Sequence, residues 1–402
     1  MKAIKLSVAA VAALAVSAFA ADGDALKPYG QITGEVGSYF VGNQTKNAIS
    51  VKSYSSRFGL TGAHGLAGGL TAVYQVEVGF NPVNGQNGLA AGGVAANGGG
   101  ITPATSYGQG DNDGEISNRN SYVGLAGGFG TVLIGNHDTP YKLAARGSGG
   151  ISSADTISEL RLMTDRRLQG AIAYVAPAAA IGGTTLALAI VPVVDSAGDE
   201  PNNGFHYSLG AIVPVEAAGL KIGLGYESAH VPAADEAVTS LFAGVNFATS
   251  GFSVGAYYEQ IDASDVTKKA ADIDDVTVTT ILVPVTVSLS DGVFVNLAFR
   301  QVSFDEPKLG AAADAATGLA LANAAGINLL GATDALGLPW DSDVTQISAQ
   351  IGKNWGKDFM AYLGVKNTAA KNVDGNGLLG GNATKEAKKS ATEFGVGMRV
   401  SF

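Results

Sequence analysis

The stretch FGVGMRVSF, residues 394–402, ends the sequence on a bare aromatic side chain. Every second residue in it is apolar, and the positions between hold glycine, arginine or serine, which is the pattern of a strand with one apolar face. In a soluble protein such a strand end is an edge that invites aggregation. In a closed membrane barrel the last strand pairs with the first, and the apolar face meets lipid. The rest of the sequence decides between these environments.

The same alternation recurs through the rest of the sequence. Residues 220–227 and 295–300 each place apolar side chains at every second position, with polar or small ones between. Segments of about ten residues with this period, separated by Gly, Asp, Asn and Pro clusters, are typical of transmembrane β-strands. The predicted strands begin near residues 27, 50, 69, 116, 129, 164, 183, 204, 219, 238, 251, 275, 292, 342, 358 and 391. The sequence therefore predicts an all-β fold, a transmembrane antiparallel β-barrel of about sixteen strands.

The connections between these strands differ in length. HGLAGG, VEAA and SDG are short turns, whereas residues 81–114 and 304–341 are long loops, and an Ala-rich and Leu-rich stretch at 310–337 predicts a short helix. Short periplasmic turns and long extracellular loops are the pattern of a bacterial outer-membrane barrel. An even number of strands returns the C-terminus to the periplasmic side, where Phe402 is the predicted assembly signal for the barrel-insertion machinery.

The first 20 residues predict a secretory signal peptide, because Lys2 and Lys5 precede an apolar run that ends in small residues. Residues 21–402 then form a single barrel domain, and loss of the two lysines leaves 23 of the 25 basic side chains against 35 acidic ones. This negative balance argues against nucleic acid as a partner. The absence of cysteine excludes a disulfide framework and thiolate metal sites.

The stretches SRFGLTGAHGLAGGLTAVYQVEVGF, residues 56–80, and NRNSYVGLAGGFGTVLIGN, residues 118–136, resemble hairpins of the general porins of Gram-negative bacteria. The opening PYGQITGEV, residues 28–36, and the terminal Phe402 are similar to the same family. The resemblance implies a homotrimer of water-filled pores in the outer-membrane lipid bilayer, for passive diffusion of small hydrophilic solutes and ions. It also implies that a third long loop, here about residues 137–163, folds inward and narrows each pore.

The resemblance further implies which side chains line the narrow part. By position they are Arg57, Arg119 and Arg167 on the wall and Asp155 and Glu159 on the loop. Period 2 places Arg57 opposite Phe58 and Arg167 opposite Leu168, so both arginines can face the lumen. The alternatives are arginines at strand ends near the lipid headgroups, Arg161 or Arg166 in their place if the register shifts, and acidic residues that only cap the loop. The sequence departs from the enterobacterial pattern at Gln31, where a wall lysine is common, and has no Pro-Glu-Phe-Gly-Gly motif in the loop.

Two features of the charge distribution bear on ion preference and oppose each other. Most acidic residues lie in the long loops, and salt at about 0.15 M screens charges beyond about 8 Å. The basic and acidic residues of the loop at 137–163 cancel, so the three wall arginines set the field at the narrow part. The sequence therefore predicts anion preference. A substrate-specific channel for a sugar, phosphate or organic acid, and a structural or adhesive barrel, remain alternatives.

The sequence contains two weak signals for other chemistry. His206 and Ser208 have an H-x-S-x-G spacing similar to outer-membrane phospholipases, but period 2 places both on the lumen wall, away from lipid. The acidic clusters Asp111, Asp113 and Glu115, and Asp272, Asp274 and Asp275, hold oxygen ligands suited to Ca²⁺, and solvated acidic turns are the alternative. The sequence contains no phosphate-binding loop, zinc-ligand spacing or dinucleotide motif, so neither a cofactor nor enzymatic activity is predicted.

Overall fold

The computed structural model describes residues 25–41, 48–83, 116–193, 204–231, 235–265, 277–305, 342–372 and 388–402. The predicted signal peptide at 1–20, the acidic clusters at 111–115 and 272–275, and the predicted helix within 310–337 lie outside these residues.

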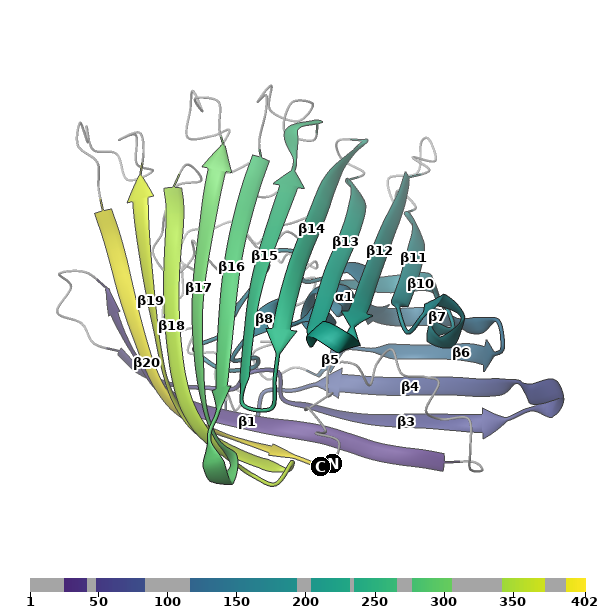
Figure 1. The fold of residues 1–402 in the computed structure, drawn as a ribbon, viewed down its shortest axis with the longest axis horizontal. Helices are drawn as coiled ribbons and strands as arrows, with labels where there is room; N and C mark the ends of the chain where they lie inside the picture. The colour runs from purple at the N-terminus through teal and green to yellow at the C-terminus, as the bar shows by residue number, and fades with distance from the viewer. Residues whose placement is uncertain are drawn as a thin grey trace, which may run out of the picture.

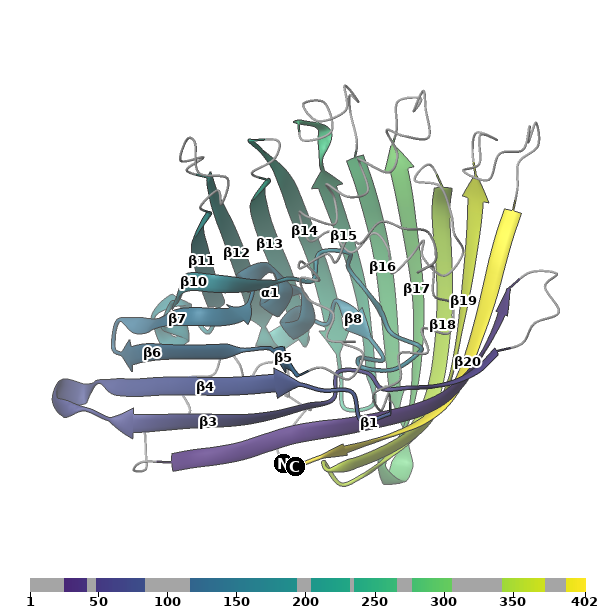
Figure 2. The same cartoon turned by 180° about the vertical axis from the view of Figure 1, so that it is seen from behind.

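Within the described residues, sixteen main strands follow one another around an antiparallel barrel (Figures 1 and 2). They are β1 (Ala25–Val41), β3 (Arg57–Gly65), β4 (Thr71–Gly79), β6 (Ser121–Gly127), β7 (Gly130–Asp138), β10 (Arg167–Val175), β11 (Thr185–Val193), β12 (Gly204–Val215), β13 (Leu220–Val231), β14 (Glu236–Ala248), β15 (Phe252–Asp262), β16 (Thr277–Ser288), β17 (Val293–Asp305), β18 (Ser342–Trp355), β19 (Phe359–Asn372) and β20 (Lys388–Ser401). The short strands β2 (Ala48–Lys52) and β5 (Ser117–Asn118) pair with β1 and β4 and extend the second and fourth strands of the wall. Each predicted strand start lies within three residues of an observed one, so the predicted barrel is confirmed.

The last strand closes the barrel against the first. β1 pairs with β20 from Gln31 opposite Ser401 to Val41 opposite Ala391. Beyond this ladder, Gly30 and Phe402 exchange two backbone hydrogen bonds of 2.9 and 3.1 Å. The glycines of β20 point inward, where a side chain at Gly395 would meet Ile157 and Glu35, and the large apolar side chains between them are exposed on the outside. The apolar face that ends the sequence is therefore the outer face of the barrel.

Residues 139–166, here called the inner loop, leave the wall after β7 and fold into the barrel interior before β10 begins (Figure 2). The inner loop contains α1 (Pro140–Ser148), β8 (Ile151–Ser152) and β9 (Leu160–Arg161). Helix α1 starts at Thr139, whose hydroxyl accepts the Lys142 N–H at 3.1 Å, and it ends at Gly149 with φ of 107°. The inner loop thus begins two residues later and ends three residues later than the predicted loop at about 137–163. Among the described residues no helix is long and apolar enough to cross a membrane.

The inner loop is held on the wall by an apolar cluster inside the barrel. The loop contributes Tyr141, Ala144, Ala145, Leu160 and Leu162, and the wall contributes Ile212, Phe242, Tyr257, Leu282 and Ala298. The Tyr141 ring meets the edge of Phe242 with ring centres 4.7 Å apart. The barrel interior therefore holds a small hydrophobic core beside its polar surface, and that core fixes where the loop lies.

Candidate pore constriction

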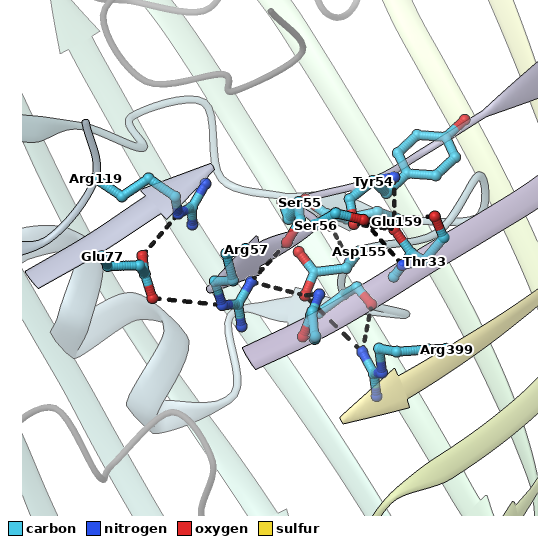
Figure 3. Close-up of polar contacts among 12 residues, drawn as sticks. Thr33, Tyr54, Ser55, Ser56, Arg57, Glu77, Arg119, Asp155, Glu159 and Arg399 are labelled. Atoms are coloured by element: carbon cyan, nitrogen blue, oxygen red, sulfur yellow. Dashed lines mark hydrogen bonds and ion pairs between the residues drawn. The ribbon is translucent and has the colours of Figure 1, made fainter. Parts of the chain in front are cut away.

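Arg57 is positioned by an interruption between β2 and β3. At residues 53–56 the ladder breaks, and side chains of β1 replace it: the Thr33 hydroxyl accepts the Tyr54 N–H at 2.8 Å, and the Ser56 hydroxyl accepts the Thr33 N–H at 2.9 Å. Ser55 adopts φ of 52° in this break, and its carbonyl accepts a hydrogen bond from Arg57 Nη1 at 3.1 Å. The break therefore aims the Arg57 guanidinium along the inner wall (Figure 3).

Glu77 of β4 joins two of the three predicted wall arginines, and its role was not predicted from the sequence. Its Oε1 lies 2.7 Å from Arg119 Nε, and its Oε2 lies 3.5 Å from Arg57 Nε (Figure 3). The same Oε2 accepts the Tyr29 hydroxyl at 3.0 Å. A signal was present, because Glu77 stands between Val76 and Val78 in a strand with period 2, which places its carboxylate on the lumen side.

The two acidic candidates of the inner loop differ in what they contact. Asp155 faces the wall: its Oδ2 accepts Gln31 Nε2 at 3.0 Å and lies 3.7 Å from Arg57 Nη1 and 3.9 Å from Arg399 Nη1. Glu159 accepts the Asp155 backbone N–H at 2.5 Å, and its ion pair is with Arg161, 3.0 Å away in the same loop. Asp155 thus bridges loop and wall, whereas Glu159 stabilises the loop itself.

Arg167 lies in a second group of charges. Its Nη2 is 3.0 Å from Asp138, which also pairs with Lys142 Nζ at 2.8 Å. Lys142 continues to Asp165 at 3.0 Å, and Asp165 pairs further with Arg146 and Arg161. Period 2 in the sequence placed Leu168 on the face opposite to Arg167, away from the lumen. This placement of Leu168 was wrong, because the ladder shifts between Leu168 and Ala171 and Leu168 is buried inside the barrel. Arg166, the alternative to Arg167, is instead buried against Glu227 at 3.2 Å.

The backbone N–H of Asp155, donated to Glu159, joins the two groups of ion pairs into one network, here called the constriction network. Its cations are Arg57, Arg119, Lys142, Arg146, Arg161, Arg167 and Arg399, and its carboxylates are Glu77, Asp138, Asp155, Glu159 and Asp165. Side chains of Arg57, Arg146 and Arg399 are 25 %, 27 % and 26 % exposed, whereas those of Glu77, Asp165 and Asp155 are 5 %, 5 % and 12 % exposed. The four most exposed members are therefore guanidinium groups, since Arg161 is 19 % exposed, ahead of Glu159 at 17 % and Asp138 at 15 %. Arg119 and Arg167 are less exposed, at 11 % and 9 %.

Ion pairing within the inner loop predicts that the loop responds to pH only under acidic conditions. Burial alone would raise the pKa of Asp165, but Arg146, Arg161 and Lys142 outweigh it and hold this pKa well below the usual value. Burial also opposes ionisation of Asp155, and Arg57 and Arg146 lower its pKa nonetheless. A lowered pKa in the folded state means that the stabilisation is complete above the unfolded value of about 3.9 and is lost as pH falls further.

We therefore expect single-channel conductance to stay constant from pH 8 to about 4 and to change only below that, as these two carboxyls take up protons. Titration of conductance in planar bilayers measures this. Asp165→Asn at pH 7 should reproduce the acid behaviour, and native conductance of this variant at pH 7 would contradict the assignment.

Of the pair His206 and Ser208, Ser208 contacts the inner loop and His206 contacts the neighbouring wall strand β13. The Ser208 side chain is buried, and its hydroxyl accepts the Tyr141 N–H of α1 at 3.0 Å. His206 Nε2 lies 2.7 Å from the His230 carbonyl. Both are on the inner wall, as their parity predicted, because Phe205, Tyr207 and Leu209 are exposed on the outside. Among the described residues, no group of three or more His, Asp or Glu side chains could hold a metal ion.

Comparison with known proteins agrees with this architecture. A family model described as Gram-negative porin matches residues 7–372. The anion-selective porin from Comamonas acidovorans is similar in structure, with a TM-score of 0.59 at 16 % identity over 94 % of this chain and 100 % of that chain. The Salmonella typhi OmpF complex with daunomycin follows with a TM-score of 0.56 at 14 % identity over 94 % and 98 %. The outer-membrane channel DcaP of Acinetobacter baumannii has a TM-score of 0.55 at 14 % identity over 94 % and 98 %. A search among curated proteins finds no match.

Proposed function

Because the chain belongs to the Gram-negative porin family, we propose that the inner loop narrows its lumen at the constriction network and that the resulting pore prefers small hydrophilic anions to cations. Membership makes the protein an outer-membrane channel for the diffusion of small solutes. The observation that supports the narrowing is the contact of Asp155, on the loop, with Arg57 and Arg399, on the wall.

The anion preference rests on which charges meet water. The network holds seven cationic side chains and five carboxylates, and its most exposed members are guanidinium groups. A permeating ion passes these groups at close range, in front of a wall of low dielectric. Acidic residues farther away than about 8 Å are screened at 0.15 M salt and weigh little at the narrow part.

Planar-bilayer recording tests both parts of the proposal. The native protein should give discrete conductance steps, and its reversal potential under a KCl gradient should have the sign of chloride preference. Absence of steps would contradict the pore, and a reversal potential of opposite sign would contradict the anion preference alone. Saturation of the current by a sugar, phosphate or organic acid would instead indicate a substrate-specific channel.

Glu77→Gln is expected to strengthen the anion preference, because Arg57 and Arg119 lose the carboxylate that they share. A unit charge about 4 Å away is worth about 1 kcal/mol even in water, so the anion-to-cation permeability ratio should rise several-fold. The reversal potential measures the change. Glu393→Gln is the matched control, since Glu393 is a wall carboxylate paired with Lys366 at 3.1 Å outside the network. Equal shifts in the two variants would contradict the role of Glu77.

We propose that the channel assembles as a homotrimer and that Phe402 is read by the barrel-insertion machinery. The wall is shorter on one side, where β4, β7, β10 and β11 have nine residues, than on the other, where β18, β19 and β20 have 14. The outer face of the short side carries exposed Val76, Val123 and Ile134 and is the face proposed for subunit contact. Cross-linking in mild detergent should give trimers, and monomers alone would contradict this assembly without affecting the barrel.

For His206 and Ser208 we propose a structural role in place of a catalytic one. The Ser208 hydroxyl is occupied by the first turn of α1, and the His206 ring is occupied by a backbone carbonyl. A serine hydrolase would need the two side chains to contact each other and a substrate. Lack of labelling of the native protein by a serine-reactive fluorophosphonate would agree with this role.

A further inference from the structure

Glu259 of β15 binds both ends of the inner loop. Its Oε1 accepts the Tyr141 hydroxyl at 2.8 Å and the Thr164 N–H at 2.9 Å, and its Oε2 accepts the Met163 N–H at 2.6 Å. Tyr141 lies in the first turn of α1, and Met163 and Thr164 lie just before the loop rejoins the wall. One wall carboxylate thus closes the loop at its two ends.

The surroundings of Glu259 make these hydrogen bonds strong. The side chain has no exposed surface, and its partner Tyr141 belongs to the apolar cluster that holds Leu160, Leu162 and Phe242. Hydrogen bonds to an ionised group gain strength where water is excluded and the local dielectric is low. The same exclusion makes any unmatched donor in this place costly, because no water can replace the lost acceptor.

We propose that Glu259 is the positioning residue that fixes the inner loop across the lumen and thereby sets the largest solute that can pass. This inference rests on the proposed narrowing of the pore by the inner loop. Glu259 does not line the path of the solute. It acts through the loop backbone, and the loop in turn carries Asp155 to the wall arginines.

Glu35 of β1 provides a matched comparison, because it holds the tip of the same loop in a different way. Its Oε2 accepts both the Ile157 N–H at 3.1 Å and the Tyr362 hydroxyl at 2.8 Å, while its buried Oε1 has no hydrogen-bond partner. An amide oxygen at the Oε2 position would keep both bonds, and the NH₂ would take the buried Oε1 position beside Gly395 of the wall, so any cost of burying it falls on the wall and not on a hydrogen bond of the loop. Glu35→Gln should therefore leave the loop in place.

Glu259→Gln has no such solution. With the amide oxygen at either position, the amide NH₂ faces at least one backbone N–H that it cannot bind. The two glutamates are both buried carboxylates of the wall, and the two substitutions change the same atoms. A difference between the variants therefore reports the hydrogen bonds of the loop and not the loss of a buried charge.

The test uses the absence of cysteine from the chain. Leu162→Cys places a thiol in the apolar cluster, at a position where the native side chain is only 2 % exposed. Its reaction with a maleimide should be slow in the parent and, because loss of a charge-assisted hydrogen bond exposes the site, about tenfold faster or more with Glu259→Gln. With Glu35→Gln the rate should stay near that of the parent. The size of polyethylene glycol that still lowers the conductance should increase for Glu259→Gln alone.

A reversible disulfide between the inner loop and the wall, here called the lock, distinguishes loss of loop position from general loss of stability. In a Cys-free background, Ser158→Cys and Gly364→Cys bring two thiols together, because a side chain carbon at Gly364 would lie 3.4 Å from Ser158 Cβ, close to disulfide geometry. Oxidation of this pair in the Glu259→Gln protein should return the polymer cut-off toward the native value, and reduction should release it again. A defect in the barrel wall would not be repaired by this lock.

The outcomes decide between the two proposals. Equal maleimide rates and equal cut-offs for Glu259→Gln and Glu35→Gln would overturn the role of Glu259. The second possible outcome is that the thiol at 162 becomes reactive in Glu259→Gln while the polymer cut-off of every variant stays at the native value. That outcome would overturn the narrowing of the pore by the loop instead. If Glu259→Gln does not insert, Tyr141→Phe removes one hydrogen bond of the three and serves in its place. Its reporter thiol should react faster than the parent, and an equal rate would overturn the proposal.

Discussion

Replacing Arg57, Arg119 and Arg167 together by alanine is expected to reverse the channel from anion to cation preference. The constriction network has seven cations and five carboxylates, and the triple substitution leaves four cations against the same five carboxylates. Glu77 loses both of its arginine partners, and Asp138 loses its ion pair with Arg167 and keeps the one with Lys142. The local field therefore changes sign where the permeating ion is closest to the wall.

The reversal potential under a KCl gradient measures this effect, and lysine at the same three positions is the matched control. Lysine keeps the charge but lacks the planar guanidinium that binds a carboxylate with two hydrogen bonds. The lysine protein should stay anion-preferring, with a smaller preference than the native channel. Retention of the native reversal potential by the alanine protein would show that these arginines do not set the selectivity.

The sequence predicted the wall well because the signal for a barrel strand is local. Alternation with period 2 can be recognised within a segment of about ten residues. It predicted where the strands lie and that Arg57 points inward. It failed at Leu168, where Gly170 adopts φ of 64° and the ladder shifts, so that parity no longer gives the face. A positive φ at one glycine is invisible to a pattern that only counts positions.

The candidate site was harder to predict because its contacts are not local. Tyr141 and Glu259, which hold the inner loop, are separated by 118 residues, and Glu35 and Ile157 by 122. No window of sequence contains both partners of such a pair. Glu77 is a different case, because the alternation in its strand predicts that its side chain faces the lumen. Its position between Arg57 and Arg119 could be predicted only with knowledge of which strands are neighbours in the barrel.

Gly210→Val is expected to displace helix α1 from the wall and to lower the single-channel conductance. Three glycines of β12 and β13 form the surface on which α1 lies: a side chain carbon at Gly210 would be 2.0 Å from the Pro140 carbonyl oxygen, at Gly223 2.1 Å from Ser148 Oγ, and at Gly225 2.9 Å from Tyr141. At Gly210 the obstacle is backbone at the start of the helix, so no side-chain rotation relieves it.

The loop must therefore move when Gly210 becomes valine, and overpacking of this kind costs about 1–3 kcal/mol. Because the wall lies on one side of α1, the only direction open to the helix is into the lumen, where it takes up part of the conducting cross-section. Gly34→Val is the matched control, since Gly34 is a strand glycine of β1 with nothing within 4 Å of the added carbon. Conductance should fall in the first variant and stay native in the second, with the same heat-modifiable gel mobility as evidence of a folded barrel in both. A native conductance in a folded Gly210→Val barrel would mean that α1 can leave its place without narrowing the pore, and the loop would then not be the element that limits flow.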